Sequence, residues 1–182
     1  MASNKKPANI KIAGIVLIQI ALVCIFCTVF CGGYTDVLNS FFESIEEFDS
    51  GKMMETMPEC EIEYLEKSLE EYEAYDSVKE YVEIAFNSLM KGVTKEYGKD
   101  LSVDYEVTDE QDLSDKELVK IQNNLKSSFN AKDTEVSKGC KLKLDVTIKG
   151  SKKTDTQTAT LKLAKVDGDW CIVENNFYNI FE

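Results

Sequence analysis

Residues 12–31 form one apolar run in which only Gln19 and Thr28 are clearly polar. An α-helix needs about 20 such residues to cross the hydrocarbon core of a bilayer. The run therefore predicts a transmembrane helix, and it confines any globular domain to the residues that follow.

The charges on either side of this run predict its orientation. The first 34 residues carry three lysines and no acidic residue, so the remaining chain has a net charge of −15 within a total of −12. The positive-inside rule then makes residues 1–11 a short cytoplasmic tail, 12–33 a transmembrane signal-anchor and 34–182 an extracytoplasmic domain. We expect a single-pass protein of the cell membrane.

Two kinds of processing are alternatives to a retained anchor. Secretory signals usually have apolar cores of about 7–15 residues, which favours retention here, but Cys31 and Gly33 would suit the small positions before a cleavage site. A lipid-accepting cysteine would follow a small residue. Each cysteine of the run (Cys24, Cys27 and Cys31) follows valine or phenylalanine, which disfavours lipidation.

Composition removes several classes of function. The chain has no histidine, and all 21 basic residues are lysines. Triads that depend on imidazole are excluded, and the commonest metal ligand is missing. The net charge of −12 argues against nucleic acid as a partner, because phosphate contacts need clustered basic residues. We expect no metal and no cofactor.

The hydrophobic period changes along the extracytoplasmic part. A period of 3.6 predicts amphipathic helices, and a period of 2 predicts strands. Helices are expected over residues 37–48, 64–72, 78–93 and 114–129, and strands over 101–107, 140–148, 158–166 and 170–173. This order predicts an α+β domain in which amphipathic helices pack on one face of a curved antiparallel sheet. The other face is rich in lysine and threonine.

Two local signals fix element boundaries. Ser114 and Glu117 form a capping box, and Leu113 and Leu118 flank it as a hydrophobic staple would. The segment VDGDW predicts a hairpin turn at 167–168. In FDSGK, Gly51 is interpreted as the end of the first helix.

Four segments, FDSGKMME, YEVTDEQDLSDKEL, CKLKLDVTIKGSKK and AKVDGDWCIV, together span about residues 36–175. They resemble membrane-anchored or lipid-anchored extracytoplasmic bacterial proteins of the nuclear transport factor two-like superfamily. The resemblance implies a cone-shaped α+β fold in the cell envelope, with a pocket between sheet and helices. The candidate lining residues are Tyr81, Phe86, Tyr105 and Trp170. A lipobox is common in such relatives, and this chain lacks one.

Three cysteines follow the apolar run: Cys60, Cys140 and Cys171. Their spacing lacks the close pairs typical of metal sites. In a meander, Cys140 and Cys171 would lie two strand spacings apart, nearly 10 Å, which is beyond the reach of a disulfide. Cys60 and Cys140 are therefore the favoured disulfide pair, and three free thiols are the alternative.

These observations predict a membrane-tethered extracytoplasmic binding or interaction module without catalytic activity of its own. Its partners are expected to be the membrane, through the N-terminal helix, and an envelope protein or an envelope polymer. The alternative is a small-molecule-binding or isomerase/hydrolase-like enzyme that uses the cone pocket. A third class is a purely structural surface protein.

Overall fold

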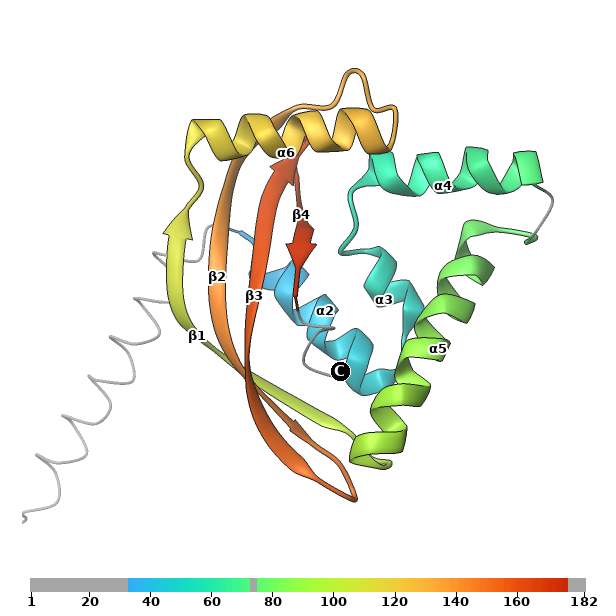
Figure 1. The fold of residues 1–182 in the computed structure, drawn as a ribbon, viewed down its shortest axis with the longest axis vertical. Coiled ribbons are helices and arrows are strands. Elements are labelled where there is room, and N and C mark those ends of the chain that lie inside the picture. Colours follow the sequence, from blue (N-terminus) through green and yellow to red (C-terminus); the bar gives the residue numbers. More distant parts are fainter. Residues whose placement is uncertain (1–32, 73–74, 177–182) are drawn as a thin grey trace, which may run out of the picture. The chain divides into compact units, whose positions relative to one another are not determined.

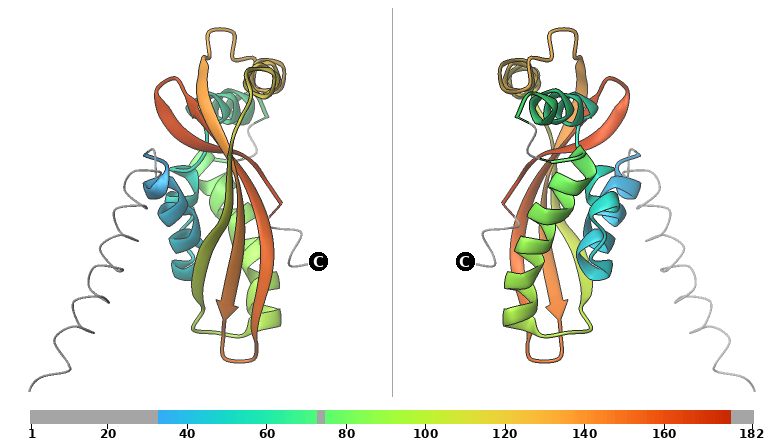
Figure 2. Two further views of the ribbon diagram at one scale, coloured as in Figure 1. Left: turned by 90° about the vertical axis from the view of Figure 1, so that its left-hand side faces the viewer. Right: turned by 90° about the vertical axis from the view of Figure 1, so that its right-hand side faces the viewer.

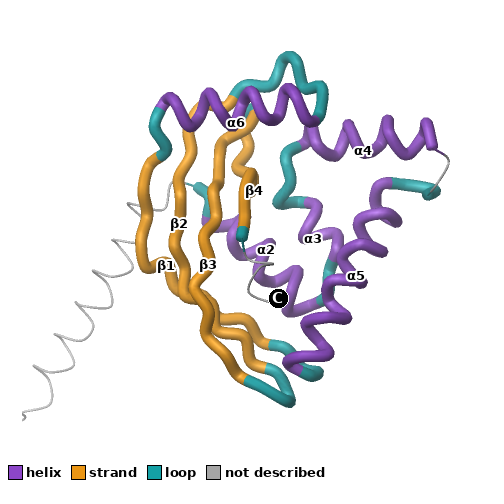
Figure 3. Tube along the Cα trace, viewed as in Figure 1, coloured by secondary structure: helices purple, strands orange, loops and turns teal. Residues whose placement is uncertain are grey.

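The computed structural model describes residues 33–72 and 75–176, and from Asp36 onward the chain forms one compact unit. The elements are α2 (Thr35–Glu47), α3 (Ser50–Met54), α4 (Glu59–Tyr72), α5 (Val78–Tyr97), β1 (Ser102–Asp112), α6 (Asp115–Ser128), β2 (Val136–Lys149), β3 (Thr154–Val166) and β4 (Asp169–Asn175) (Figure 1, Figure 3). The predicted transmembrane run lies outside the described residues. Within them, no helix has the length and apolarity needed to span a bilayer.

The α+β class is confirmed. One antiparallel sheet has the strand order β1-β2-β3-β4, so each strand pairs with its neighbour in sequence. The predicted hairpin joins β3 to β4: Asp167 and Gly168 both have positive φ, 51° and 106°, as a type I′ turn requires.

Most of the hydrophobic core lies on one face of the sheet, which we call the α2 face. The alternating residues predicted on β2 and β3 are all buried there: Cys140, Leu142, Leu144, Val146, Ile148, Ala159, Leu161 and Leu163. Helix α2 covers the same face, since Phe42 stacks on Tyr105 of β1 at 4.4 Å between ring centroids. The carboxylate of Glu46 also accepts a hydrogen bond from the backbone N–H of Val103 (3.2 Å).

The prediction that helices cover one face alone was wrong. At one end of the sheet α6 packs on the opposite face, which we call the α6 face, and Figure 2 shows α2 and α6 on opposite sides. Leu125 of α6 is buried there with Val136, Ala164, Val166 and Cys171. Successive residues Leu163 and Ala164 are both buried, so β3 has core on both sides at this end. The rest of the α6 face carries the predicted lysines and threonines.

The chain after the first helix differs from expectation. Helix α2 ends at Glu47, and Phe48 follows it with a φ of 60°. Asp49 then starts α3 as its N-cap, accepting hydrogen bonds from the backbone N–H of Gly51 (2.8 Å) and of Lys52 (3.3 Å). The interpretation of Gly51 as a helix end was therefore wrong, because the aspartate two residues earlier caps a new helix.

The C-terminus of α5 is held by the β2–β3 hairpin. The carbonyl of Tyr97 accepts a hydrogen bond from the backbone N–H of Lys152 (2.8 Å), and the carbonyl of Lys99 accepts one from Ser151 (3.0 Å). Gly98, with a φ of 95°, lets the chain leave the helix. Residues more than 50 positions apart in sequence thus fix the direction of α5.

The capping box of α6 gives a first prediction. The Glu117 carboxylate accepts hydrogen bonds from the backbone N–H of Ser114 (2.9 Å) and from its hydroxyl (2.6 Å). We expect Ser114→Ala to lower the free energy of unfolding by about 1 kcal/mol, because the capping box loses the hydroxyl that binds the Glu117 carboxylate. Denaturant unfolding measures this loss. Lys116→Ala, an exposed change in the same turn, is the control, and equal midpoints for the two variants would contradict the role of the cap.

Candidate functional site

Helix α4 is the least buried helix of the sheet-and-helix unit in the part that the structure describes. Its sequence places a glutamate at almost every second position near its start, and none of its side chains between residues 59 and 70 is buried. Tyr64 is 40% exposed. The helix lies between two hollows, one on each side.

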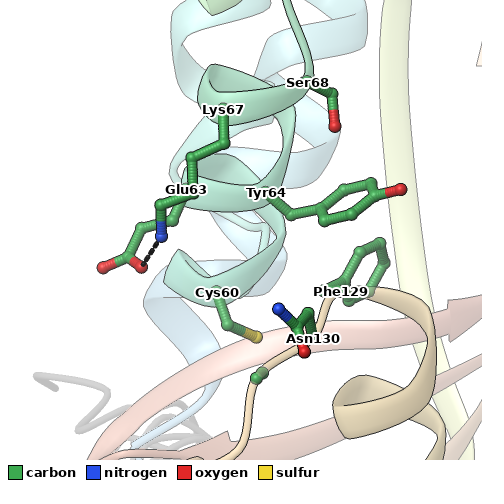
Figure 4. Close-up of a pocket in the computed structure, with 8 residues that line it drawn as sticks. Cys60, Glu63, Tyr64, Lys67, Ser68, Phe129 and Asn130 are labelled. Carbon is green, nitrogen blue, oxygen red and sulfur yellow. Dashed lines mark hydrogen bonds and ion pairs between the residues drawn. The ribbon is translucent and has the colours of Figure 1, made fainter. Parts of the chain in front are cut away.

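The first hollow, the α4–α6 cleft, has a volume of about 290 Å³. One face of α4 and the chain just after α6 line it: Cys60, Glu63, Tyr64, Lys67, Ser68, Phe129, Asn130 and Ala131 (Figure 4). The rings of Tyr64 and Phe129 contact each other at 5.8 Å between centroids. Lys67 Nζ and Glu63 Oε2 form an exposed ion pair at 3.3 Å.

The chemistry of the α4–α6 cleft does not favour catalysis. Burial raises the pKa of the Cys60 thiol above its ordinary value, so the nucleophilic thiolate is scarce at neutral pH. Its lysine is paired with a glutamate. Among the described residues, no group of three or more acidic or cysteine side chains is arranged to hold a metal ion. The cleft offers a ring surface and hydrogen-bonding groups.

The second hollow, the α4–α5 groove, has a volume of about 320 Å³ and is mostly apolar. It lies on the other side of α4 and is lined by Met53, Met57, Glu61, Leu65, Tyr81, Val82, Ala85, Phe86 and Leu89. The α5 residues fall on one helical face because they recur every three to four positions. Ala85 is exposed and Leu89 is partly buried at this solvent-open surface.

The four predicted pocket residues do not come together. Tyr81 and Phe86 both line the α4–α5 groove. Tyr105 lies on the α2 face, where its hydroxyl donates to Asn39 Oδ1 (2.7 Å) and its ring stacks on α2. Trp170 lies on β4, with Lys138 Nζ 5.2 Å from its ring centroid. The first two therefore mark a groove between helices, and the other two belong to separate surfaces.

Glu61 is a site residue that was not among the predicted pocket residues. It is half-buried in the α4–α5 groove, and burial raises the pKa of its carboxyl. A signal for this was present: Glu61 and Leu65 are four residues apart, so they share a face of α4. A carboxyl in apolar surroundings with a raised pKa is a feature of functional sites.

The buried carboxyl of Glu61 gives a second prediction. Because its pKa is higher in the folded than in the unfolded chain, the folded state binds a proton more tightly, and stability rises as pH falls through the folded-state pKa. Glu61→Gln removes the cost of burying a charge, so we expect it to raise the denaturation midpoint at pH 7. The gain should disappear below the unfolded-state pKa of glutamate. A variant with the same gain at every pH would contradict this account.

The three described cysteines are free thiols, and the structure does not join Cys60 to Cys140. Cys140 pairs with Leu163 and lies on the α2 face, whereas Cys171 pairs with the next residue, Ala164, and lies on the α6 face. Cys60 packs against the cluster that contains Cys171. Burial raises the pKa of both Cys140 and Cys171 to about 12.

In comparisons with known proteins, the chain matches no family model, no curated protein and no solved structure.

Proposed function

We propose that this chain is a membrane-tethered, extracytoplasmic binding module without catalytic activity of its own, and that the α4–α5 groove is its docking surface. The tether is the apolar run of residues 12–31, and the lysines before it orient the domain. The resemblance of four segments of the chain to extracytoplasmic proteins with a cone-shaped fold supports this location. The partner is an apolar or amphipathic segment of another envelope protein.

The exposed apolar surface around α4 and α5 carries this proposal. Tyr75 is 37% exposed, and its ring contacts that of Tyr81 on the groove wall at 5.3 Å between centroids. The groove between these helices has apolar walls. Contiguous exposed apolar surface on a folded domain is typical of interaction sites. Met53 and Met57 add flexible, polarizable side chains, which suit a surface that adapts to its partner.

Charge pairing on the α6 face makes an anionic polymer the weaker choice of partner. Lys149 Nζ lies 2.7 Å from Asp104 Oδ2, and Lys162 Nζ lies 2.6 Å from Glu174 Oε2. These lysines are already neutralised by acids of neighbouring strands. An acidic domain with paired lysines would attract a polyanion weakly.

One observation supports the alternative that the protein is an enzyme. The α4–α5 groove is open and holds the Glu61 carboxyl, whose pKa is raised by burial, beside the apolar wall that includes Tyr81. A carboxyl of this kind can transfer protons. Native mass spectrometry of the purified full-length protein tests this alternative: a small molecule retained by the parent chain and lost in Glu61→Gln would favour it.

Site-specific photo-crosslinking in living cells tests the docking surface. A photo-reactive amino acid replaces Ala85, which is exposed on the wall of the groove, or Lys143, which is exposed on the sheet. We expect a discrete adduct from position 85 that is absent from position 143. Leu65→Asp in the same chain should abolish it, because it places a charge in the apolar groove.

Two results would overturn the proposal. Identical adducts from positions 85 and 143, or adducts that survive Leu65→Asp, would show that the groove has no special role. Protease treatment of intact cells tests the orientation separately: full protection of the domain after residue 34 would contradict an extracytoplasmic location.

A further inference from the structure

Two of the cysteines are brought to the same place by elements far apart in sequence. Cys60 lies in the first turn of α4 and packs against the cluster of Leu125, Val136, Ala164, Val166 and Cys171 under α6. The backbone N–H of Ile172 donates to the carbonyl of Thr56 (2.8 Å). This bond fixes the residue next to Cys171 beside the turn that leads into α4.

We propose that Cys60 and Cys171 form an intramolecular disulfide that joins α4 to β4, made by exchange with an external disulfide oxidant that reaches Cys60 through the α4–α6 cleft. The proposed site differs from the Cys60–Cys140 pair expected from sequence. It rests on the packing around α6 and does not depend on the docking surface proposed for the other side of α4.

The exposure of the two thiols sets the order of the exchange. Cys60 is half-buried and lines the cleft, whereas Cys171 is buried. The Cys60 thiol loses a proton, and its thiolate attacks the oxidant's disulfide, which gives a mixed disulfide and releases one thiolate. The Cys171 thiol then loses a proton, and its thiolate attacks the Cys60 sulfur. This attack displaces the oxidant's second thiolate. The protein loses two electrons and two protons, and the oxidant becomes two thiols.

Electrostatic coupling is consistent with this proximity. Burial is the main cause that raises the pKa of Cys171 to about 12, and the charge of Cys60 contributes to the same shift. The pKa of Cys60 is also raised, chiefly by burial. Neither thiol is therefore strongly ionised near neutral pH, so exchange should be slow without a dedicated oxidant.

The disulfide would act on the helix that is least anchored by packing. None of the α4 side chains between residues 59 and 70 is buried, and the helix separates the cleft from the α4–α5 groove. A covalent link at its first turn would fix the start of α4 against the sheet. Its reduction would leave the helix held by the partly buried contacts alone.

Peptide mapping of the full-length protein tests the pairing. Trypsin cleaves only after lysine here, because the chain has no arginine. Cys60 falls in peptide 53–67, Cys140 in 139–141, Cys171 in 166–182, and the three cysteines of the apolar run share peptide 12–52. The purified protein in detergent is treated with oxidised glutathione, its remaining thiols are alkylated, and the digest is analysed without reduction.

We expect peptides 53–67 and 166–182 to be recovered joined, at their summed mass less two hydrogen atoms, from protein that runs as a monomer. Cys140→Ser is the matched control and should retain the link. Cys60→Ser, a change at a half-exposed position that the fold should tolerate, should abolish it. A link to peptide 139–141 or 12–52, a link only between two chains, or a glutathione adduct on Cys60 that never resolves would each overturn the proposal.

Discussion

Leu144→Ala will lower the free energy of unfolding by about 2–5 kcal/mol, the range measured when a buried leucine is truncated to alanine. Leu144 is completely buried at the middle of β2. Its cross-strand neighbours are Val107 on β1 and Ala159 on β3, and the small Ala159 cannot fill the space that the change leaves. Denaturant unfolding of the full-length protein, followed by far-ultraviolet circular dichroism, measures the loss.

The neighbouring Val107 supplies the control. It pairs directly with Leu144 but is 38% exposed on an edge strand. We expect Val107→Ala to change stability by less than about 0.5 kcal/mol, as exposed substitutions usually do. A loss for Leu144→Ala as small as that for Val107→Ala would show that the α2 face is not the main core.

Gly139→Ala will destabilise the protein by about 1–3 kcal/mol, the cost typical of overpacking. A Cβ at this position would lie 2.6 Å from the carbonyl oxygen of Leu163 and 2.8 Å from Leu113 Cδ1. The carbonyl belongs to the neighbouring strand and cannot move without breaking the sheet ladder. The absence of a side chain at Gly139 is what lets the residues at the start of α6 approach the α6 face.

Gly92 on α5 supplies a control for which we expect the opposite change in stability. A Cβ added there meets no atom within 4 Å. Gly92→Ala should therefore stabilise the helix by about 1 kcal/mol, which is the difference in helix propensity between the two residues. If Gly139→Ala were as well tolerated as Gly92→Ala, the close packing of α6 on the sheet would be contradicted.

The parts of the fold with a strong local signal could be predicted from sequence. The alternation in CKLKLDVTI predicted the buried face of β2 residue by residue, because side chains of a strand alternate between faces. Equally local signals predicted the hairpin at Asp167–Gly168 and the start of α6 at Ser114. Each depends on residues within a few positions of one another.

The placement of α6 could not be predicted in this way. The alternation along β3 places Ala159, Leu161 and Leu163 on one face. No local pattern shows that α6 covers Ala164 and Val166 on the other face. Pairing irregularities lie between Val136 and Lys138 and between Lys162 and Leu163. Such bulges depend on the partner strand, so they leave little trace in the sequence of one strand.

Only part of the candidate site could be predicted, because only part of it depends on local spacing. The groove residues Tyr81 and Phe86 share a face of one helix, so their proximity follows from spacing. Tyr105 and Trp170 were grouped with them through the expected cone pocket, and tertiary packing places them elsewhere. The approach of Cys60 to the cluster around Cys171 joins residues more than 100 positions apart, which periodicity cannot show.

Hydrogen exchange of α4 in the full-length protein tests most directly whether the α4–α5 groove is a docking surface. Exchange is compared between the protein in its native membranes and the purified protein in detergent. We predict that the backbone amides of α4 and of the exposed face of α5 exchange more slowly in the membranes, where a partner covers the groove, while those of β2 are unchanged. Equal exchange of α4 in the two samples would contradict the account.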